Sequence, residues 1–236
     1  MRKRPLNKWK SYRKQREEQE ALGVQGSNKG MKYELQTIIC GTGKVGYGDT
    51  IQAAASYLRG SERTSTPSKG AKHFKSEETA RLSEWVEAEG LWYPVDFSLF
   101  VSEGAEQKVY LNGEKEVLKL NDAIYYTSWL DYFYNLLLNN YFFPDTAYEL
   151  KGFYKDKDTL YAVVKQDFIK EDAPTSLEEV RAFMELNGFE NIRNNDYHNP
   201  ELGIILEDLH EEKVLTRKGA LFFIDTVFYI EPSFWN

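Results

Sequence analysis

The 236-residue sequence has few of the residues that would indicate a disulfide, a zinc site or a membrane segment. Its one cysteine, Cys40, cannot form an internal disulfide, and its three histidines are scattered without the paired spacing of zinc ligands. It also lacks an apolar run of 18 residues and a signal-peptide core. We therefore expect a soluble protein of a reducing compartment, the cytoplasm, with no membrane partner.

The residues that are present predict a folded protein with an uneven charge distribution. Hydrophobic residues make up 42% of the chain and aromatic residues 15%, which is enough for a sizeable core. Residues 1–16 carry eight Lys or Arg and no acid, whereas the other 220 residues hold 22 basic against 37 acidic side chains. This basic arm could contact nucleic-acid phosphates, or it could be a solvated tail or a contact for the acidic body.

A segment rich in Gly, Ser and Thr, residues 60–72, is typical of a boundary between regions. It separates a basic arm and flanking region, residues 1–72, from a domain of residues 73–236. Within the first region we expect a short strand, a glycine-rich loop, and a helix that begins near Asp49 or Thr50. Residues 41–46 spell G-x-G-x-x-G, but the expected helix begins too late for a dinucleotide-binding turn and no series of βα units follows, which favours a flexible loop.

In the second region, a helix is predicted from Ser76 to a stop at Gly90. A hairpin follows around Asn112 and Gly113. A strict two-residue turn there pairs Lys119 with Glu106 and places Val109 on the opposite face of the hairpin. A bulge near Gly113 would instead put Val109 and Lys119 on one face.

Residues 123–142 repeat large apolar side chains on several helical faces and predict a buried helix, which Pro144 ends. A second hairpin turns at residues 155–158, and Ser176 to Glu179 has the spacing of a capping box at the start of another helix. We expect a β-rich lobe over residues 91–170, with the buried helix packed against it, and then a small helical part.

Two apolar runs near the end of the chain each finish in a carboxylate, Asp208 and Asp225. We expect them at the ends of two neighbouring strands, where they could hold magnesium on a nucleotide. Hairpin-end acids without a function are the alternative.

This order of elements resembles the kinase-fold domain of polyvalent proteins, which are large multidomain proteins of phages and conjugative elements, and more distantly the aminoglycoside-phosphotransferase-like kinases. The resemblance covers roughly residues 91–230. It implies an α+β, protein-kinase-like fold with an antiparallel β-rich N-lobe and a reduced helical C-terminal part. It also implies ATP and Mg²⁺ as cofactors and phosphoryl transfer to a protein or small molecule, including Ser, Thr or Tyr of proteins.

The kinase catalytic loop has the pattern H-R-D-L-x-x-x-N. Asp208 occupies the place of its catalytic base, but Lys213 stands where a magnesium-binding asparagine is expected. Asp225 matches the metal-binding aspartate of D-F-G, although Thr226 and Val227 follow it. An ammonium group near the two aspartates competes with a metal ion for their carboxylates.

The resemblance also assigns the nucleotide contacts. Gly104 and Glu106 lie in the loop over the phosphates, Lys119 is the lysine for the α- and β-phosphates, and Gln166 lies at the adenine hinge. The helix residue that steadies Lys119 stays open between Asp131, which is also part of a capping pair, and Asn135.

Three functions are compatible with these residues. The first is an active phosphotransferase that uses Lys119, Asp208 and Asp225. The second is a catalytically impaired pseudokinase or nucleotide-binding interaction module, in which Lys213 has displaced a metal, and the third is a structural domain of a mobile-element protein whose basic arm contacts DNA.

Overall fold

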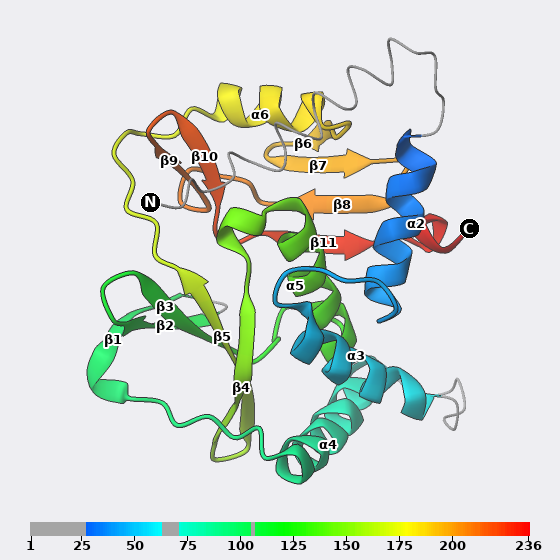
Figure 1. The fold of residues 1–236 in the computed structure, drawn as a ribbon, viewed down its shortest axis with the longest axis vertical. Coiled ribbons are helices and arrows are strands. Elements are labelled where there is room, and N and C mark those ends of the chain that lie inside the picture. Colours follow the sequence, from blue (N-terminus) through cyan, green and yellow to red (C-terminus); the bar gives the residue numbers. More distant parts are fainter. Residues whose placement is uncertain (1–26, 63–70, 105–106) are drawn as a thin grey trace.

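The computed structural model of the protein describes residues 27–62, 71–104 and 107–236. The basic arm, most of the Ser/Thr-rich segment and Glu106 therefore lie outside the described residues. A five-stranded sheet and a four-stranded sheet lie on two sides of a central helix, α5, and the helices α2, α3 and α4 pack around that helix (Figure 1).

The first sheet is antiparallel throughout and has the strand order β1-β2-β3-β5-β4. Its strands are β1 (Phe100–Glu103), β2 (Gln107–Asn112), β3 (Glu116–Asn121), β4 (Glu149–Asp156) and β5 (Thr159–Asp167). Both predicted hairpins are present and belong to this one sheet, which confirms the β-rich lobe. The short 3-10 helix η1 (Phe97–Leu99) precedes β1.

The register of the first hairpin differs from that of a strict two-residue turn. Asn112 pairs with Glu116 across a three-residue connection that begins at Gly113, whose φ is +73°. Lys119 therefore lies opposite Val109, which is not the pairing that a strict two-residue turn would give. Paired residues of antiparallel strands point to the same face, so Val109 and Lys119 share one side of the sheet.

Helix α5 (Trp129–Phe142) is the predicted buried helix, and twelve of its fourteen residues are buried. It begins at Trp129, later than predicted, because Ser128 caps it: the Ser128 hydroxyl accepts a hydrogen bond from the Asp131 N–H at 3.0 Å. The 3-10 helix η2 (Pro144–Thr146) follows and leads into β4.

The predicted N-terminal strand is wrong, because residues 27–39 form helix α2 (Ser27–Ile39). Leu35, Ile38 and Ile39 have helical spacing and are fully buried in a core shared with α5. Helix α3 (Gly48–Glu62) begins close to where the sequence predicts it, and α4 (Ala71–Glu89) includes the helix predicted from Ser76. The division of the chain at residue 72 stays a prediction, since helices on both sides of it contribute to one core.

The G-x-G-x-x-G segment is the connection between α2 and α3, so a helix and not a strand precedes it. A Cβ atom on Gly43 would lie 2.4 Å from the Thr37 hydroxyl and 2.9 Å from the Ile38 backbone nitrogen. Glycine is thus required there by close packing of the chain on α2. This geometry agrees with the expected loop and not with a dinucleotide-binding turn.

The C-terminal part is rich in strands, so the expected reduced helical part is wrong. Within the described residues it has one α-helix, α6 (Leu177–Leu186), which Ser176 caps as predicted, and a final 3-10 helix, η3 (Pro232–Trp235). Its strands are β6 (Glu190–Arg193), β7 (Asp196–Asn199), β8 (Ile204–Glu207), β9 (Val214–Arg217), β10 (Ala220–Phe223) and β11 (Val227–Ile230). Four-residue strands that alternate between core and surface carry too short a pattern to predict.

Strand β8 pairs with β11, whereas β10 pairs with β9 in a separate hairpin. The strands that precede Asp208 and Asp225 are therefore not neighbours in one sheet, contrary to the prediction. The two acids still meet at one end of a ladder: Val227 pairs with Glu207, so Asp225 precedes β11 where Asp208 follows β8.

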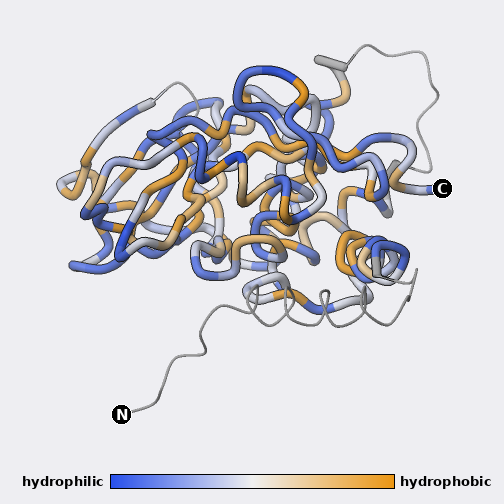
Figure 2. The backbone as a smooth tube through the Cα atoms, turned by 90° about the horizontal axis from the view of Figure 1, so that it is seen from above, coloured by the Kyte–Doolittle hydropathy of each residue, from blue (hydrophilic) through white to orange (hydrophobic). Residues whose placement is uncertain are grey.

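The hydrophobic stretches run through the middle of the molecule, while hydrophilic stretches occupy its outer turns (Figure 2). One cluster of buried side chains joins α2, α3, α4 and α5 to both sheets, and a smaller cluster around Tyr110, Leu120 and Val163 covers the other face of the five-stranded sheet. Among the described helices, none is long and apolar enough to cross a membrane.

Candidate active site

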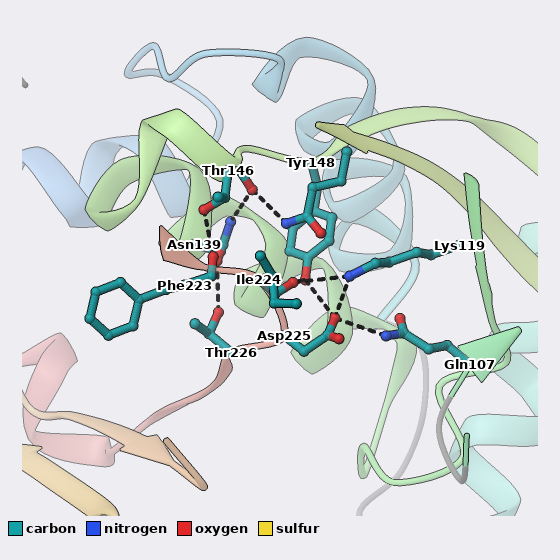
Figure 3. A network of polar contacts seen from close by, with 10 residues as sticks. Gln107, Lys119, Asn139, Thr146, Tyr148, Phe223, Ile224, Asp225 and Thr226 are labelled. Atoms are coloured by element: carbon teal, nitrogen blue, oxygen red, sulfur yellow. Dashed lines mark hydrogen bonds and ion pairs between the residues drawn. The ribbon is translucent and has the colours of Figure 1, made fainter. Parts of the chain in front are cut away.

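Lys119 lies almost fully buried on β3, and its ammonium group contacts the chain that follows β10. Lys119 Nζ is 2.5 Å from Asp225 Oδ1 and donates to the Ile224 carbonyl at 3.0 Å. It also lies 5.6 Å from the centre of the Tyr148 ring, within the range of a cation–π interaction. The fold thus brings together two predicted site residues that are 106 positions apart in the sequence (Figure 3).

The Asp225 carboxylate receives its contacts on one oxygen. Besides Lys119, the Gln107 amide donates to Oδ1 at 2.8 Å, and the Tyr148 hydroxyl lies 3.4 Å from the same atom. Within the described part of the chain, Oδ2 takes no part in these contacts, and the Asp225 side chain is 26% exposed. One carboxylate oxygen is therefore fixed and the other is available to a ligand.

The residues around Asp225 are tied to helix α5. The Thr226 hydroxyl donates to Asn139 Oδ1 at 2.7 Å, and the Phe228 N–H donates to Asn135 Oδ1 at 2.8 Å. The position after Asp225, where the kinase pattern has phenylalanine, thus carries a buried hydroxyl that bonds to the helix. Asn135 is engaged with β11 and does not steady Lys119.

The segment that joins α5 to β4 supplies the rest of the network in Figure 3. The Thr146 hydroxyl donates to the Phe223 carbonyl at 2.5 Å. The Thr146 backbone carbonyl accepts hydrogen bonds from the side-chain amides of Gln166 and Asn139. The Tyr148 hydroxyl donates to the Ile224 carbonyl at 2.7 Å. Burial raises the pKa of Tyr148 and the nearby Asp225 carboxylate raises it further, so this hydroxyl stays protonated as a donor.

Asp208 lies in the loop after β8 and pairs with the lysine that replaces the expected asparagine. Lys213 Nζ is 2.7 Å from Asp208 Oδ2, and the His210 ring lies 3.6 Å from the same oxygen. Asp208 has a φ of +63°, a left-handed conformation that is uncommon outside glycine and that recurs at functional sites. The Asp208 side chain is 56% exposed and so is open to a partner in solution.

A backbone contact links this loop to the lysine site. The Ile224 N–H donates to the Lys213 carbonyl at 2.9 Å, and the Ile224 carbonyl accepts from Lys119. Lys119 and Asp225 are in direct contact, and Asp208 joins them through Lys213 and Ile224.

The other predicted nucleotide contacts are placed differently from one another. Gly104 is exposed, and its N–H already donates to the Gln107 carbonyl at 2.9 Å, so that amide is engaged within the β1–β2 turn. Gln166 is buried and its amide donates to the Thr146 carbonyl at 2.7 Å. Its side chain thus supports the loop before β4. Glu106 lies outside the described residues.

An open hollow of about 540 Å³ lies beside the Asp208 loop. It is lined by Glu171, Pro174, Thr175, Leu177, Glu211, Glu212 and Leu215. Three glutamates repel a triphosphate, so the charge pattern favours phosphates at Lys119 and not in this hollow.

The question of a helix carboxylate for Lys119 has a clear answer within the described residues. Within residues 27–62, 71–104 and 107–236, Asp225 is the one carboxylate that contacts the Lys119 ammonium, whereas the N–H of Asp131 on α5 donates to the Ser128 hydroxyl at the helix cap. The described residues also contain no group of three His, Cys, Asp or Glu placed to hold a metal ion.

Sequence reasoning missed Gln107, Thr146 and Tyr148. The three asparagines of the apolar α5 sequence were a usable signal, because buried amides need hydrogen-bond partners and so predict a polar network beside the helix. The contact of Tyr148 with Lys119 has no such signal, since it depends on where the residues before β4 lie relative to β3, with β5 between the two strands.

Comparison with known proteins adds one match. The sequence model of a family described as the serine/threonine/tyrosine kinase found in polyvalent proteins matches residues 75–232. A search of curated proteins and a search of solved structures each found no match to this chain. The match covers the five-stranded sheet, α5 and both candidate aspartates, and the chain belongs to this family of Ser/Thr/Tyr kinases of polyvalent proteins.

Proposed function

We propose that this chain is an ATP-dependent phosphotransferase in which Lys119 binds the α- and β-phosphates, Asp225 carries the metal ion and Asp208 orients the acceptor hydroxyl. The observation that carries the proposal is the 2.5 Å contact of Lys119 Nζ with Asp225 Oδ1, which joins the third strand of the sheet to the second residue after β10. Phosphoryl transfer needs a lysine and a metal-binding carboxylate in one site, because catalysis rests on positioning and on charge.

The residues fit a magnesium ion that arrives with the nucleotide. Mg²⁺ is usually bound by one or two carboxylates together with phosphate oxygens and water, and the free Oδ2 of Asp225 supplies such a ligand. When bound, the ion neutralises phosphate charge. Lys119 and Gln107 keep Oδ1 in place, which orients the carboxylate for that ligand.

A second function, a pseudokinase that binds nucleotide without efficient transfer, is favoured by one contact. Lys213 pairs with Asp208 at 2.7 Å, so the candidate base already bears a cation where the kinase pattern has a neutral amide. An acceptor hydroxyl would have to approach a carboxylate whose charge is partly satisfied.

Thermal unfolding with ATP, with and without Mg²⁺, tests nucleotide binding. We expect ATP to raise the melting temperature of the wild type, Mg²⁺ to add to the rise, and Lys119→Met to abolish it. Equal melting curves with and without ATP would contradict nucleotide binding altogether.

Lys213→Asn, measured with radiolabelled ATP as donor, separates the two functions. If only this residue impairs the site, the variant gains magnesium-dependent transfer, and Asp208→Asn added to it removes the gain. If the wild type already transfers phosphate and Lys213→Asn lowers the rate, the pseudokinase alternative fails.

A further inference from the structure

The ammonium of Lys119 has three partners, and the hold of one of them, Asp225, weakens when a metal ion takes up part of its charge. If Asp225 serves as the metal ligand, its carboxylate shares its negative charge between the metal ion and Lys119. The Ile224 carbonyl and the Tyr148 ring remain, because neither can bind the metal from its position against the lysine. The support of Lys119 in the loaded site therefore depends on these two groups.

Tyr148 touches both sides of the site. Its ring lies 5.6 Å from Lys119 Nζ, and its hydroxyl donates at 2.7 Å to the Ile224 carbonyl, which Lys119 also contacts. Tyr148 is 4% exposed, so the ring and the ammonium face each other with little water between them. A cation–π contact is stronger when it is desolvated in this way.

The backbone of Tyr148 is fixed by the central helix. Asn140 on α5 accepts a hydrogen bond from the Tyr148 N–H at 2.7 Å and donates its amide to the Tyr148 carbonyl at 2.7 Å. Asn140 is itself buried. Two bonds to one buried amide leave Tyr148 little freedom to shift, so its ring is a rigid surface for the lysine.

We propose that Tyr148 is a positioning residue of the nucleotide site: its ring holds the Lys119 ammonium, and its hydroxyl holds the Ile224 carbonyl, so that one side chain sets the separation of the phosphate lysine from the metal aspartate. This inference rests on the proposed function. Tyr148 thus supports Lys119 from outside helix α5.

An aromatic ring and a carboxylate differ in how far they neutralise the positive charge of the lysine. A carboxylate neutralises the ammonium and competes with the phosphates for it, whereas an aromatic face carries no net charge. Lys119 therefore keeps its full charge for the α- and β-phosphates once Asp225 has engaged a metal.

The experiment lowers the electron density of the aromatic ring while keeping its shape. Tyr148→Phe removes the hydroxyl alone, and trifluorophenylalanine incorporated at position 148 also weakens the negative face of the ring. The matched control is the same fluorinated residue at position 153, where Phe153 is fully buried in the core on β4, the strand that begins directly after Tyr148. Calorimetry with ADP in the presence of Mg²⁺ measures binding to the loaded site, in which the metal ion engages Asp225 and Lys119 depends on the Tyr148 ring.

We expect the fluorinated ring at position 148 to bind ADP roughly three- to tenfold more weakly than Tyr148→Phe, from the usual strength of a desolvated cation–π contact. The control at position 153 leaves the affinity unchanged. Tyr148→Phe retains the ADP affinity but lowers kcat with Mg²⁺-ATP more than it raises KM, since the hydroxyl positions Ile224 and thereby Asp225.

Equal ADP affinities for the phenylalanine and the fluorinated ring at position 148 would overturn the inference, provided that Lys119→Met still loses affinity. If the wild type and Lys119→Met both fail to bind ADP, the proposed function fails, and the role of Tyr148 falls with it. A loss of affinity at position 153 as large as at position 148 also overturns the inference, because the effect would then be one of packing.

Discussion

The ion pair between Lys119 and Asp225 is buried unequally, and this predicts that its two members differ in their effect on stability. The Lys119 side chain is 5% exposed and that of Asp225 is 26% exposed. Asp225→Asn leaves a buried ammonium with the Ile224 carbonyl, the Tyr148 ring and a neutral amide. Lys119→Met leaves a carboxylate that keeps the Gln107 amide and has access to water.

Removing one member of a fully buried pair costs about 3–5 kcal/mol. For Asp225→Asn we expect a loss of about 2–3 kcal/mol in the free energy of unfolding, because the remaining partners of Lys119 offset part of that cost. For Lys119→Met we expect about 1 kcal/mol, since methionine refills the space of the lysine stem and water solvates the carboxylate. The double variant should be more stable than Asp225→Asn alone, because it contains no unpaired charge.

Urea unfolding followed by tryptophan fluorescence measures these differences. A surface pair serves as the control: Lys165 contacts both Glu116 and Glu149, so Glu116→Gln should cost less than about 1 kcal/mol. If Lys119→Met proves as destabilising as Asp225→Asn, or the double variant is the least stable of the three, the unequal burial does not control the energetics and the reasoning is wrong.

Three further predictions concern stability. Gly43→Ala should lower the free energy of unfolding by about 2 kcal/mol through the clash of its Cβ atom. Gly46→Ala, whose Cβ meets nothing within 4 Å, should change it by no more than about 0.5 kcal/mol. Equal losses for the two variants in urea unfolding would contradict this. Thr226→Val should cost about 1–3 kcal/mol because Asn139 loses a buried donor, and Thr226→Ser should restore most of it. Burial and two nearby carboxylates raise the pKa of Glu207, so its negative charge destabilises the folded state at neutral pH, and this cost disappears as the pH falls through that pKa. Glu207→Gln should therefore stabilise the protein at pH 7 and lose this advantage near pH 4. Urea titrations at the two pH values would measure the difference.

The sequence predicted those parts of the fold that carry a long pattern. The buried helix, the two hairpins of the sheet and the capped helix α6 each have eight or more residues of consistent periodicity or a specific turn signal, and all are present. The C-terminal strands are four residues long, and the apolar residues of α2 fit a short extended run as well as a helix, so the sequence predicts a strand there. Local patterns of that length do not distinguish the two structures.

For the site, the contact of Lys119 with Asp225 was predictable from the order of the elements, whereas its other partners were not. Whether Lys119 faced a pocket depended on the register of one hairpin, which a three-residue connection at Gly113 decides. The engagement of Gln166 with Thr146, and of Tyr148 with Lys119, arises from the packing of β4 and η2 against α5. Such contacts join segments that are distant in the sequence, so the spacing of residues does not predict them.

The burial of α5 has a consequence for how the chain folds. Its neighbours come from both ends of the described chain: α2 and α3 precede the family match, and β11 lies near its close. Contacts of such high sequence separation form late, since a long loop must close before they stabilise anything. A fragment of residues 75–232 lacks α2 and α3 and would expose Tyr134 and Leu137 to water, so we expect the unit that folds cooperatively to be larger than the region that defines the family. Expression of that fragment should yield an aggregation-prone chain, and supplying residues 27–74 as a separate peptide should recover folded protein.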